Sequence, residues 1–234
     1  MNKFTKWVLG AGLVIALGVA ACAPMPTTAQ SVASPVAPVN ASAPVGALSA
    51  SEADALAFMR EEEKLAHDVY VALYAKWQLP VFQNIANSEQ THTDAIKTLL
   101  ERYSVADPAA GKAVGVFANA TLQGLYDQLV KQAGQSLADA LRVGALIEEI
   151  DIQDLQTRIA QTDKADIKLV YANLMRGSRN HLRSFTAQLK AQTGATYAPQ
   201  QLTQAEYAAI IAGTTETGRG ASNAQGNGFR GGQR

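Results

Sequence analysis

Residues 81–103 read VFQNIANSEQTHTDAIKTLLERY, and the spacing of the apolar side chains in this stretch decides the fold class. The residues that recur at intervals of three and four are Ile85, Glu89, His92, Ile96 and Leu99. That interval is typical of one face of an amphipathic helix. The face is interrupted at its middle by a carboxylate and an imidazole, so the sequence predicts a helix whose buried side carries two polar groups.

Three further stretches have the same helical period, and they cover about residues 51–77, 136–160 and 164–192. We expect Ser51 to cap the first of these helices, with Asp54 three residues later as a short version of a capping box. Gly194 follows the last stretch and is expected to end it, because glycine readily takes the left-handed conformation that closes a helix.

The connections between the four stretches are short, long and short in turn. The long one contains a short helical segment, Thr121 to Gln132, which begins after Asn119. Short connections make consecutive helices antiparallel neighbours. The expected fold is therefore all-α, a ferritin-like four-helix bundle with one long crossover between the second and third helices.

The composition supports a folded helical domain and argues against several classes of function. Apolar residues make up 47% of the chain, which is enough for a buried core, and the 20 basic residues equal the 20 acidic ones. No basic field indicates a nucleic-acid partner. No glycine-rich phosphate loop precedes a helix, so we expect no nucleotide cofactor, and no sequence context singles out a nucleophilic serine.

The N-terminal residues have the pattern of a bacterial lipoprotein signal. Lys3 and Lys6 precede an apolar run over residues 7–21 that is too short to be a good membrane span. The run ends in Val-Ala-Ala-Cys22, which resembles a lipobox, the site where a cysteine becomes lipidated. We therefore expect a signal peptide over residues 1–21 and a cell-envelope lipoprotein, anchored through Cys22 in the outer membrane facing the periplasm or otherwise extracytoplasmic.

The remaining boundaries follow from composition. Residues 22–48 are rich in Pro, Ala and Ser and carry no charge, which is typical of a semi-extended tether. Residues 213–234 are rich in Gly and Asn and nearly free of apolar residues, so we expect a disordered tail. The helical bundle is assigned to residues 49–212.

Each predicted helix has its apolar stripe interrupted near the middle by a residue that resists burial. A buried carboxylate without a partner costs several kcal/mol or changes its pKa. Four such interruptions at corresponding heights indicate one shared site, in which the side chains satisfy one another through a metal ion. The predicted ligands are Glu63, Glu89, His92, Glu148 and His181.

The predicted helix over residues 164–192 supplies only part of the usual di-metal motif. Bundle di-iron sites take one Glu from each of two helices and Glu-x-x-His from each of the other two. Glu89 and His92 form a complete motif, whereas His181 is preceded at the matching position by Ser178. Asp151, one turn beyond Glu148, could compensate for the missing carboxylate, because residues three apart share a helix face. A water molecule or a site with a single metal ion are the alternatives.

Several neighbouring residues remain open as alternatives. Glu62 competes with Glu63, and Glu149 with Glu148, because adjacent residues point about 100° apart around a helix. Tyr70 is either a hydrogen-bond partner of a ligand carboxylate or an ordinary core tyrosine. Two further residues are expected on the solvated surface, namely Glu61 and His67.

Four stretches resemble a bacterial ferritin-like family known as domain of unknown function 2202. They are FMREEEKLAHDVYVALYAKW, VFQNIANSEQTHTDAIKTLLERY, VGALIEEIDIQDLQ and MRGSRNHLRSF, and the resemblance covers about residues 50–211. The first two also look like the first half of a rubrerythrin-type bundle. That resemblance implies iron and a reaction with oxygen or peroxide. The chain departs from rubrerythrin at Ser178 and in having no Cys-x-x-Cys pair for an electron-transfer module.

Two functions of different class are expected. The first is a metal-dependent oxidoreductase that binds one or two ions of iron or manganese and reacts with oxygen or peroxide or oxidises ferrous iron. The second is a non-enzymatic metal-binding or interaction module anchored to the membrane, and Ser178 slightly favours it because a depleted second site weakens two-electron chemistry. The expected partners are metal ions, a membrane reached through the lipid anchor, and a second copy of the chain in a homodimer.

Overall fold

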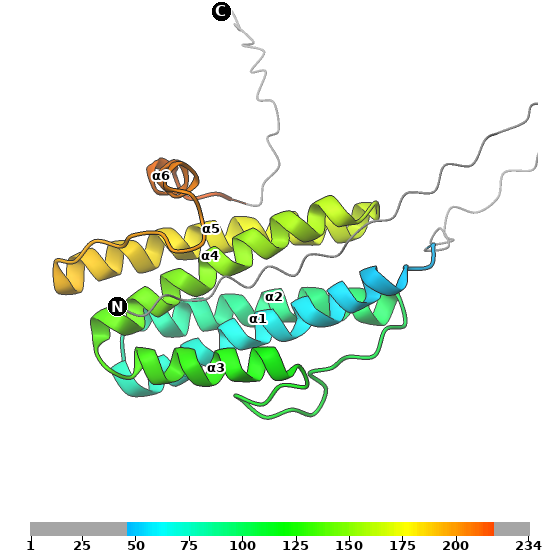
Figure 1. The fold of residues 1–234 in the computed structure, drawn as a ribbon, viewed down its shortest axis with the longest axis horizontal. Helices are drawn as coiled ribbons and strands as arrows, with labels where there is room; N and C mark the ends of the chain where they lie inside the picture. Colours follow the sequence, from blue (N-terminus) through cyan, green and yellow to red (C-terminus); the bar gives the residue numbers. More distant parts are fainter. Residues whose placement is uncertain (1–45, 218–234) are drawn as a thin grey trace, which may run out of the picture. The chain divides into compact units, whose positions relative to one another are not determined.

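A computed structural model describes residues 46–217, which form six α-helices and contain no strand (Figure 1). The signal peptide, Cys22, most of the tether and most of the C-terminal tail lie outside the described residues. The helices are α1 (Ala50–Trp77), α2 (Pro80–Arg102), α3 (Ala120–Ala133), α4 (Leu137–Gln161), α5 (Ala165–Thr193) and α6 (Gln204–Ala212). The prediction of an all-helical domain is confirmed.

The helix ends follow from local hydrogen bonding, and one predicted end is wrong. The N-cap of α1 is Ser49, not Ser51: its side chain accepts from the Glu52 amide, and the Glu52 carboxylate accepts from the Ser49 amide. Glutamate reaches back to the cap more easily than the shorter Asp54, so the full capping box forms two residues earlier. Gly194 ends α5 in the left-handed conformation, as predicted.

The helices pack as two pairs. In each of the pairs α1–α2 and α4–α5 the helices lie side by side along their length, and the pairs meet through α2–α5 and α1–α4 contacts (Figure 1). The third helix covers α1 and α4, and α6 lies against α5. Among residues 46–217, no helix has both the length and the apolar content that crossing a membrane requires.

The core consists of two apolar clusters separated by a polar layer. The larger cluster contains Tyr70, Phe82 and Phe185 and extends under α3. The smaller contains Met59, Ile96 and other residues from the opposite end of the four long helices, which are α1, α2, α4 and α5. Between them the long helices contribute buried polar residues, which we call the polar belt: Glu62, Glu63, Glu89, His92, Glu148, Asp151, Ser178 and His181.

Glu61 is buried, which makes the prediction of a solvated side chain wrong. Its side chain is 2% exposed and accepts hydrogen bonds from the backbone amides of Ala118 and Asn119, the latter at 2.9 Å. These amides stand at the start of α3, where the helix leaves donors without partners and carries a partial positive charge. Glu61 therefore fastens the α2–α3 connection to α1.

The end of the described chain is held against α5, where the sequence predicts disorder from Gly213 onward. The Glu216 carboxylate accepts from Arg179 and from Arg183, the second contact at 3.0 Å. The Asn180 side chain accepts from the Glu216 amide and donates to the Glu216 carbonyl. The composition of the tail does not indicate this contact. The segment is held by one carboxylate, that of Glu216, which lies between the guanidinium groups of Arg179 and Arg183.

The Glu216 contact should be visible in the pH dependence of stability. Hydrogen bonding from Arg179 lowers the pKa of Glu216 to about 2. A lowered folded-state pKa gives stability that is complete above the pKa of an unfolded Glu, about 4.3, and is lost as the pH falls toward the folded value. We expect Glu216→Gln to lower the melting temperature of the full chain by about 2–4 °C at pH 7.

The difference between the two proteins should shrink as the pH falls from 5 to 3, measured by circular dichroism. Glu101→Gln, which changes an exposed carboxylate on α2, should leave the melting temperature within about 1 °C of the parent. An unchanged melting temperature for Glu216→Gln at pH 7 would show that the contact contributes nothing.

Candidate metal centre

The polar belt brings together the five predicted ligands from the four long helices. Glu63 comes from α1, Glu89 and His92 from α2, Glu148 from α4 and His181 from α5. All five are buried, and the three carboxylates are at most 2% exposed. The five side chains meet because each lies near the middle of its helix. The helices are paired side by side, so their middles lie at the same height in the domain.

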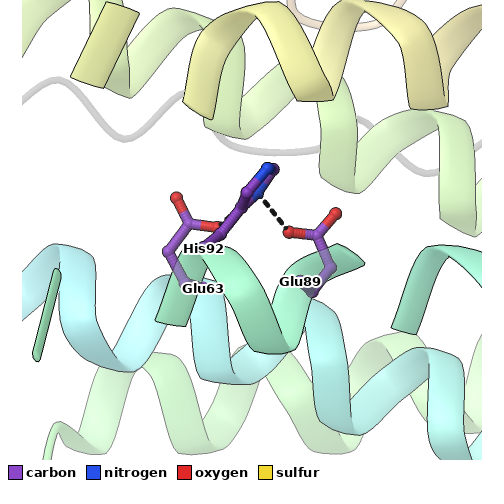
Figure 2. A group of neighbouring side chains, drawn as sticks. All are labelled: Glu63, Glu89 and His92. Carbon is purple, nitrogen blue, oxygen red and sulfur yellow. Dashed lines mark ion pairs between the residues drawn. The ribbon is translucent and has the colours of Figure 1, made fainter. Parts of the chain in front are cut away.

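The five side chains form two groups that share Glu89. The first group is Glu63, Glu89 and His92, the second is Glu89, Glu148 and His181, and in each the ligand atoms lie within 4.8 Å of one another. The Oε2 atom of Glu89 is 2.7 Å from Nδ1 of His92, and its Oε1 atom is 2.7 Å from Nδ1 of His181. Figure 2 shows the first group, in which the His92 ring lies between the two carboxylates.

The outer carboxylate of each group lies slightly further from its histidine. Glu63 Oε2 is 3.4 Å from His92 Nδ1, and Glu148 Oε2 is 3.5 Å from His181 Nδ1. The imidazole rings of His92 and His181 are stacked with their centroids 5.6 Å apart. Each group thus contains one histidine, one carboxylate of its own and one oxygen of Glu89.

The close contacts in these groups lack the alignment of hydrogen bonds. Nδ1 of His92, Nδ1 of His181 and Oε1 of Glu89 are buried, and none has a hydrogen-bond partner among the described residues. Atoms that bind one metal ion at about 2.0–2.2 Å converge on it and lie about 3 Å from one another without an aligned proton. The orphaned nitrogen and oxygen atoms therefore fit the ligand set of a metal ion.

The charges of the belt also favour a bound cation. Burial opposes ionisation of Glu89, but the flanking His92 and His181 lower the pKa of that carboxyl below its ordinary value. Burial raises the pKa of Glu63 to about 7, although His92 opposes the shift. Burial also raises the pKa of Glu148, and the charge of Glu89 adds to this shift.

The two histidines hold their protons strongly. Burial lowers the pKa of His181, but Glu89 and Glu148 outweigh it and raise the pKa to about 10. Burial likewise opposes protonation of His92, and Glu89 and Glu63 raise its pKa well above the ordinary value. A divalent cation would replace these protons, because metal ligands bind in their deprotonated forms.

Two further side chains fix the ligands in place. The Tyr70 hydroxyl donates to Glu148 Oε1 at 2.5 Å, and the ring is fully buried. The Nε2 atom of His181 lies 3.0 Å from Ser88 Oγ. Tyr70 was one of the alternatives that the sequence left open, whereas Ser88 carries no signal beyond its place next to Glu89. Partners of this kind set the orientation of metal ligands.

Gly177 on α5 is a site residue that sequence reasoning misses. A Cβ atom at this position would lie 2.5 Å from Nε2 of His92 and 2.6 Å from its Cε1 atom. Contacts below 3.0 Å essentially never occur for real Cβ atoms. The His92 ring therefore occupies the space that any larger side chain at position 177 would need.

Other residues in the polar belt or next to it lie outside the two ligand groups. Glu149 points away from Glu148 and accepts from the backbone amides of residues 200–202, the amide of Gln200 at 2.7 Å. Glu62 is buried beside Asp154 and Asp151, and burial, followed by those carboxylates, raises its pKa well above the ordinary value. His67 is half-buried and its Nδ1 atom lies 2.8 Å from Asp68.

Iron or manganese, the metals that the sequence implies, fit this donor set. Carboxylate oxygens and imidazole nitrogens suit both metals and also zinc, so the ligand types alone do not choose among them. No thiolate ligand is available within residues 46–217, because the single cysteine of the chain is Cys22.

The chain is similar to proteins that are described as uncharacterized or hypothetical. It matches the family described as an uncharacterized protein domain, DUF2202, over residues 52–214. It is 51% identical over 177 residues to the uncharacterized protein MJ0754 of Methanocaldococcus jannaschii, covering 76% of this chain and 95% of the relative. The crystal structure of hypothetical protein MJ0754 from Methanococcus jannaschii matches with a TM-score of 0.72 at 50% identity, over 75% of this chain and 100% of that one. The chain therefore belongs to the DUF2202 family.

Proposed function

We propose that this protein is a ferritin-like metal protein with two metal positions between its four long helices. In this reading α1, α2, α4 and α5 form the four-helix bundle, and α3 lies in the long crossover between the second and third bundle helices. The observation that carries the proposal is the position of Glu89, whose two oxygens each lie 2.7 Å from a different histidine.

The two groups define the ligands of the two positions. Glu63, Glu89 and His92 would hold the first ion, and Glu89, Glu148 and His181 the second. Glu89 belongs to both groups and would offer one oxygen to each position. Three protein ligands leave coordination positions for a small oxidant, which is the arrangement of a reactive rather than a purely structural metal site.

The chemistry of the centre would be oxidation. Iron or manganese, when bound, would supply the transfer of electrons from a reductant, such as ferrous iron as a substrate, to oxygen or peroxide. The residues of the chain position the ligands: Tyr70 holds Glu148, and Ser88 contacts the distal nitrogen of His181. The apolar clusters on both sides of the belt keep bulk water from the ligand atoms.

Metal binding without catalysis is the second candidate function. Ser178 favours it, because α5 lacks the carboxylate that a di-iron bundle has one turn before the histidine. The two functions differ in turnover, so consumption of peroxide or ferrous iron by the loaded protein separates them. We further propose that Cys22 carries a lipid and places the domain at the cell envelope, which metabolic labelling with a fatty acid and Cys22→Ser would test.

The shared carboxylate predicts an unequal effect of two similar substitutions. The parent chain, loaded anaerobically with ferrous iron, should retain about two ions, measured by elemental analysis after desalting. Glu148→Gln should reduce this to about one, because that carboxylate serves one group. Glu89→Gln should remove both, because each group loses an oxygen.

Glu149→Gln is the matched control for this experiment. Its carboxylate is the sequence neighbour of Glu148 but binds the backbone of residues 200–202, so two ions should remain. Equal losses for Glu89→Gln and Glu148→Gln would contradict the sharing of Glu89. A folded parent chain that retains no ion would contradict the proposed function.

The space at Gly177 predicts a second effect on metal affinity. Gly177→Ala should displace the His92 ring and weaken binding at the first position by about tenfold or more, as loss of ligand orientation commonly does. The measurement is a titration against a chelator of known affinity. Gly124→Ala on α3 is the control, because a Cβ atom there meets nothing within 4 Å. Equal affinities for both variants would show that the His92 ring needs no such space.

A further inference from the structure

Asp151 and Ser178 form a buried pair in the polar belt that belongs to neither of the two ligand groups. Asp151 lies on α4 one turn after Glu148, and Ser178 lies on α5 one turn before His181. Their side chains face the interior, since Asp151 is 6% exposed and Ser178 is not exposed at all. Residues three apart share a helix face, so each member of the pair points to the same side as a ligand.

Ser178 holds Asp151 by one of its two oxygens. The Ser178 hydroxyl donates to Asp151 Oδ2, and the same hydroxyl lies 3.0 Å from the carbonyl oxygen of Leu174 one turn earlier. These two contacts fix the direction of the serine side chain. They therefore also fix the orientation of the carboxylate that it holds.

The second oxygen of Asp151 has no partner. Oδ1 is buried and accepts no hydrogen bond from any described residue. An unpartnered buried carboxylate oxygen is costly, and native proteins have such atoms mainly where an ion or a water completes the site. A cavity of about 10 Å³ is lined by Asp151, Glu62 and Glu63 together with apolar side chains of α1, α3 and α4, so Asp151 and a ligand of the first position border the same space.

The carboxylate of Asp151 is affected by charges of both ligand groups. Burial raises its pKa well above the ordinary value, and the charges that add to the shift are those of Glu63, Glu89 and Glu148. Glu63 belongs only to the first group and Glu148 only to the second. Asp151 borders the same cavity as Glu63 of the first group and lies one helix turn from Glu148 of the second, so its carboxylate is placed next to a residue of each group.

On the adjacent part of α5, a longer side chain at position 177 would meet the His92 ring, and one at position 178 would meet Asp151. Gly177 borders the His92 ring, and the Ser178 hydroxyl already contacts Asp151. We propose that Asp151, held by Ser178, is a sixth metal ligand and supplies from α4 the second shared carboxylate of the centre. This inference rests on the proposed function, and it assigns to Ser178 the role of a positioning residue rather than that of a lost ligand.

The experiment compares metal content and thermal stability of the full chain with and without ferrous iron. Asp151→Asn keeps the shape and can still accept from Ser178, but it removes the charge. We expect it to bind both ions at least about tenfold less tightly, because each position loses an oxygen, and to show a smaller rise in melting temperature on metal loading than the parent. The matched control is Asp94→Asn, the same change at an exposed position of α2, which should behave as the parent does.

A swap variant tests the origin of the carboxylate. Asp151→Ala combined with Ser178→Glu removes the carboxylate from α4 and returns one to α5, so it should restore metal binding that Asp151→Ala alone loses. If the combined variant does not fold, the comparison of Asp151→Asn with Asp94→Asn still decides.

The outcomes separate this inference from the proposed function. A parent chain that retains two ions while Asp151→Asn binds both with unchanged affinity and unchanged melting temperature would overturn the role of Asp151 and leave the five-ligand centre intact. A parent chain that takes up no ion would overturn both.

Discussion

The burial of Glu89 between two histidines is the contact on which the rest of the domain depends. The carboxylate is 2% exposed, and its two oxygens face His92 on its own helix and His181 on α5. Because α1 and α2 form one pair and α4 and α5 the other, the contact to His181 joins the two pairs at the centre of the domain. A charge in this place is tolerable only with opposite charge around it, which constrains every residue of the polar belt.

The belt also explains why the apolar core is divided. A continuous core of leucine and isoleucine would stabilise four long helices better than buried ions do, since replacing buried ion pairs by apolar residues is often neutral or stabilising. The chain instead has apolar clusters at the two ends of the helices and groups its ionisable residues between them. Such an arrangement gives up stability at the position where the proposed metal centre would require charged ligands.

The sequence predicts the helices and the inward placement of Glu63, Glu89, His92, Glu148 and His181, because both follow from one helical period. His92 and Glu89 stand out as polar residues on an apolar stripe, and that reasoning needs no tertiary contact. The structure places Glu61 and Glu149 on other faces, against the backbone of loops, and only the folded path of those loops reveals it. Gly177 is likewise unpredictable, because its importance lies in the His92 ring from another helix. The apolar pattern of the sequence does not predict the short helix α6, because its nine residues have no buried face.

The acidic run at residues 61–63 shows how one turn of helix serves three purposes. Successive residues point about 100° apart, so three glutamates in a row must face three environments. Glu61 binds the start of α3, Glu62 lies beside Asp154 and Asp151, and Glu63 reaches His92. On α4, Glu148 faces the ligand groups while Glu149 holds residues 200–202. The ligand carboxylates and the loop anchors are therefore neighbours on rigid helices, so the same turn of helix that places a carboxylate in the proposed centre also fixes a loop.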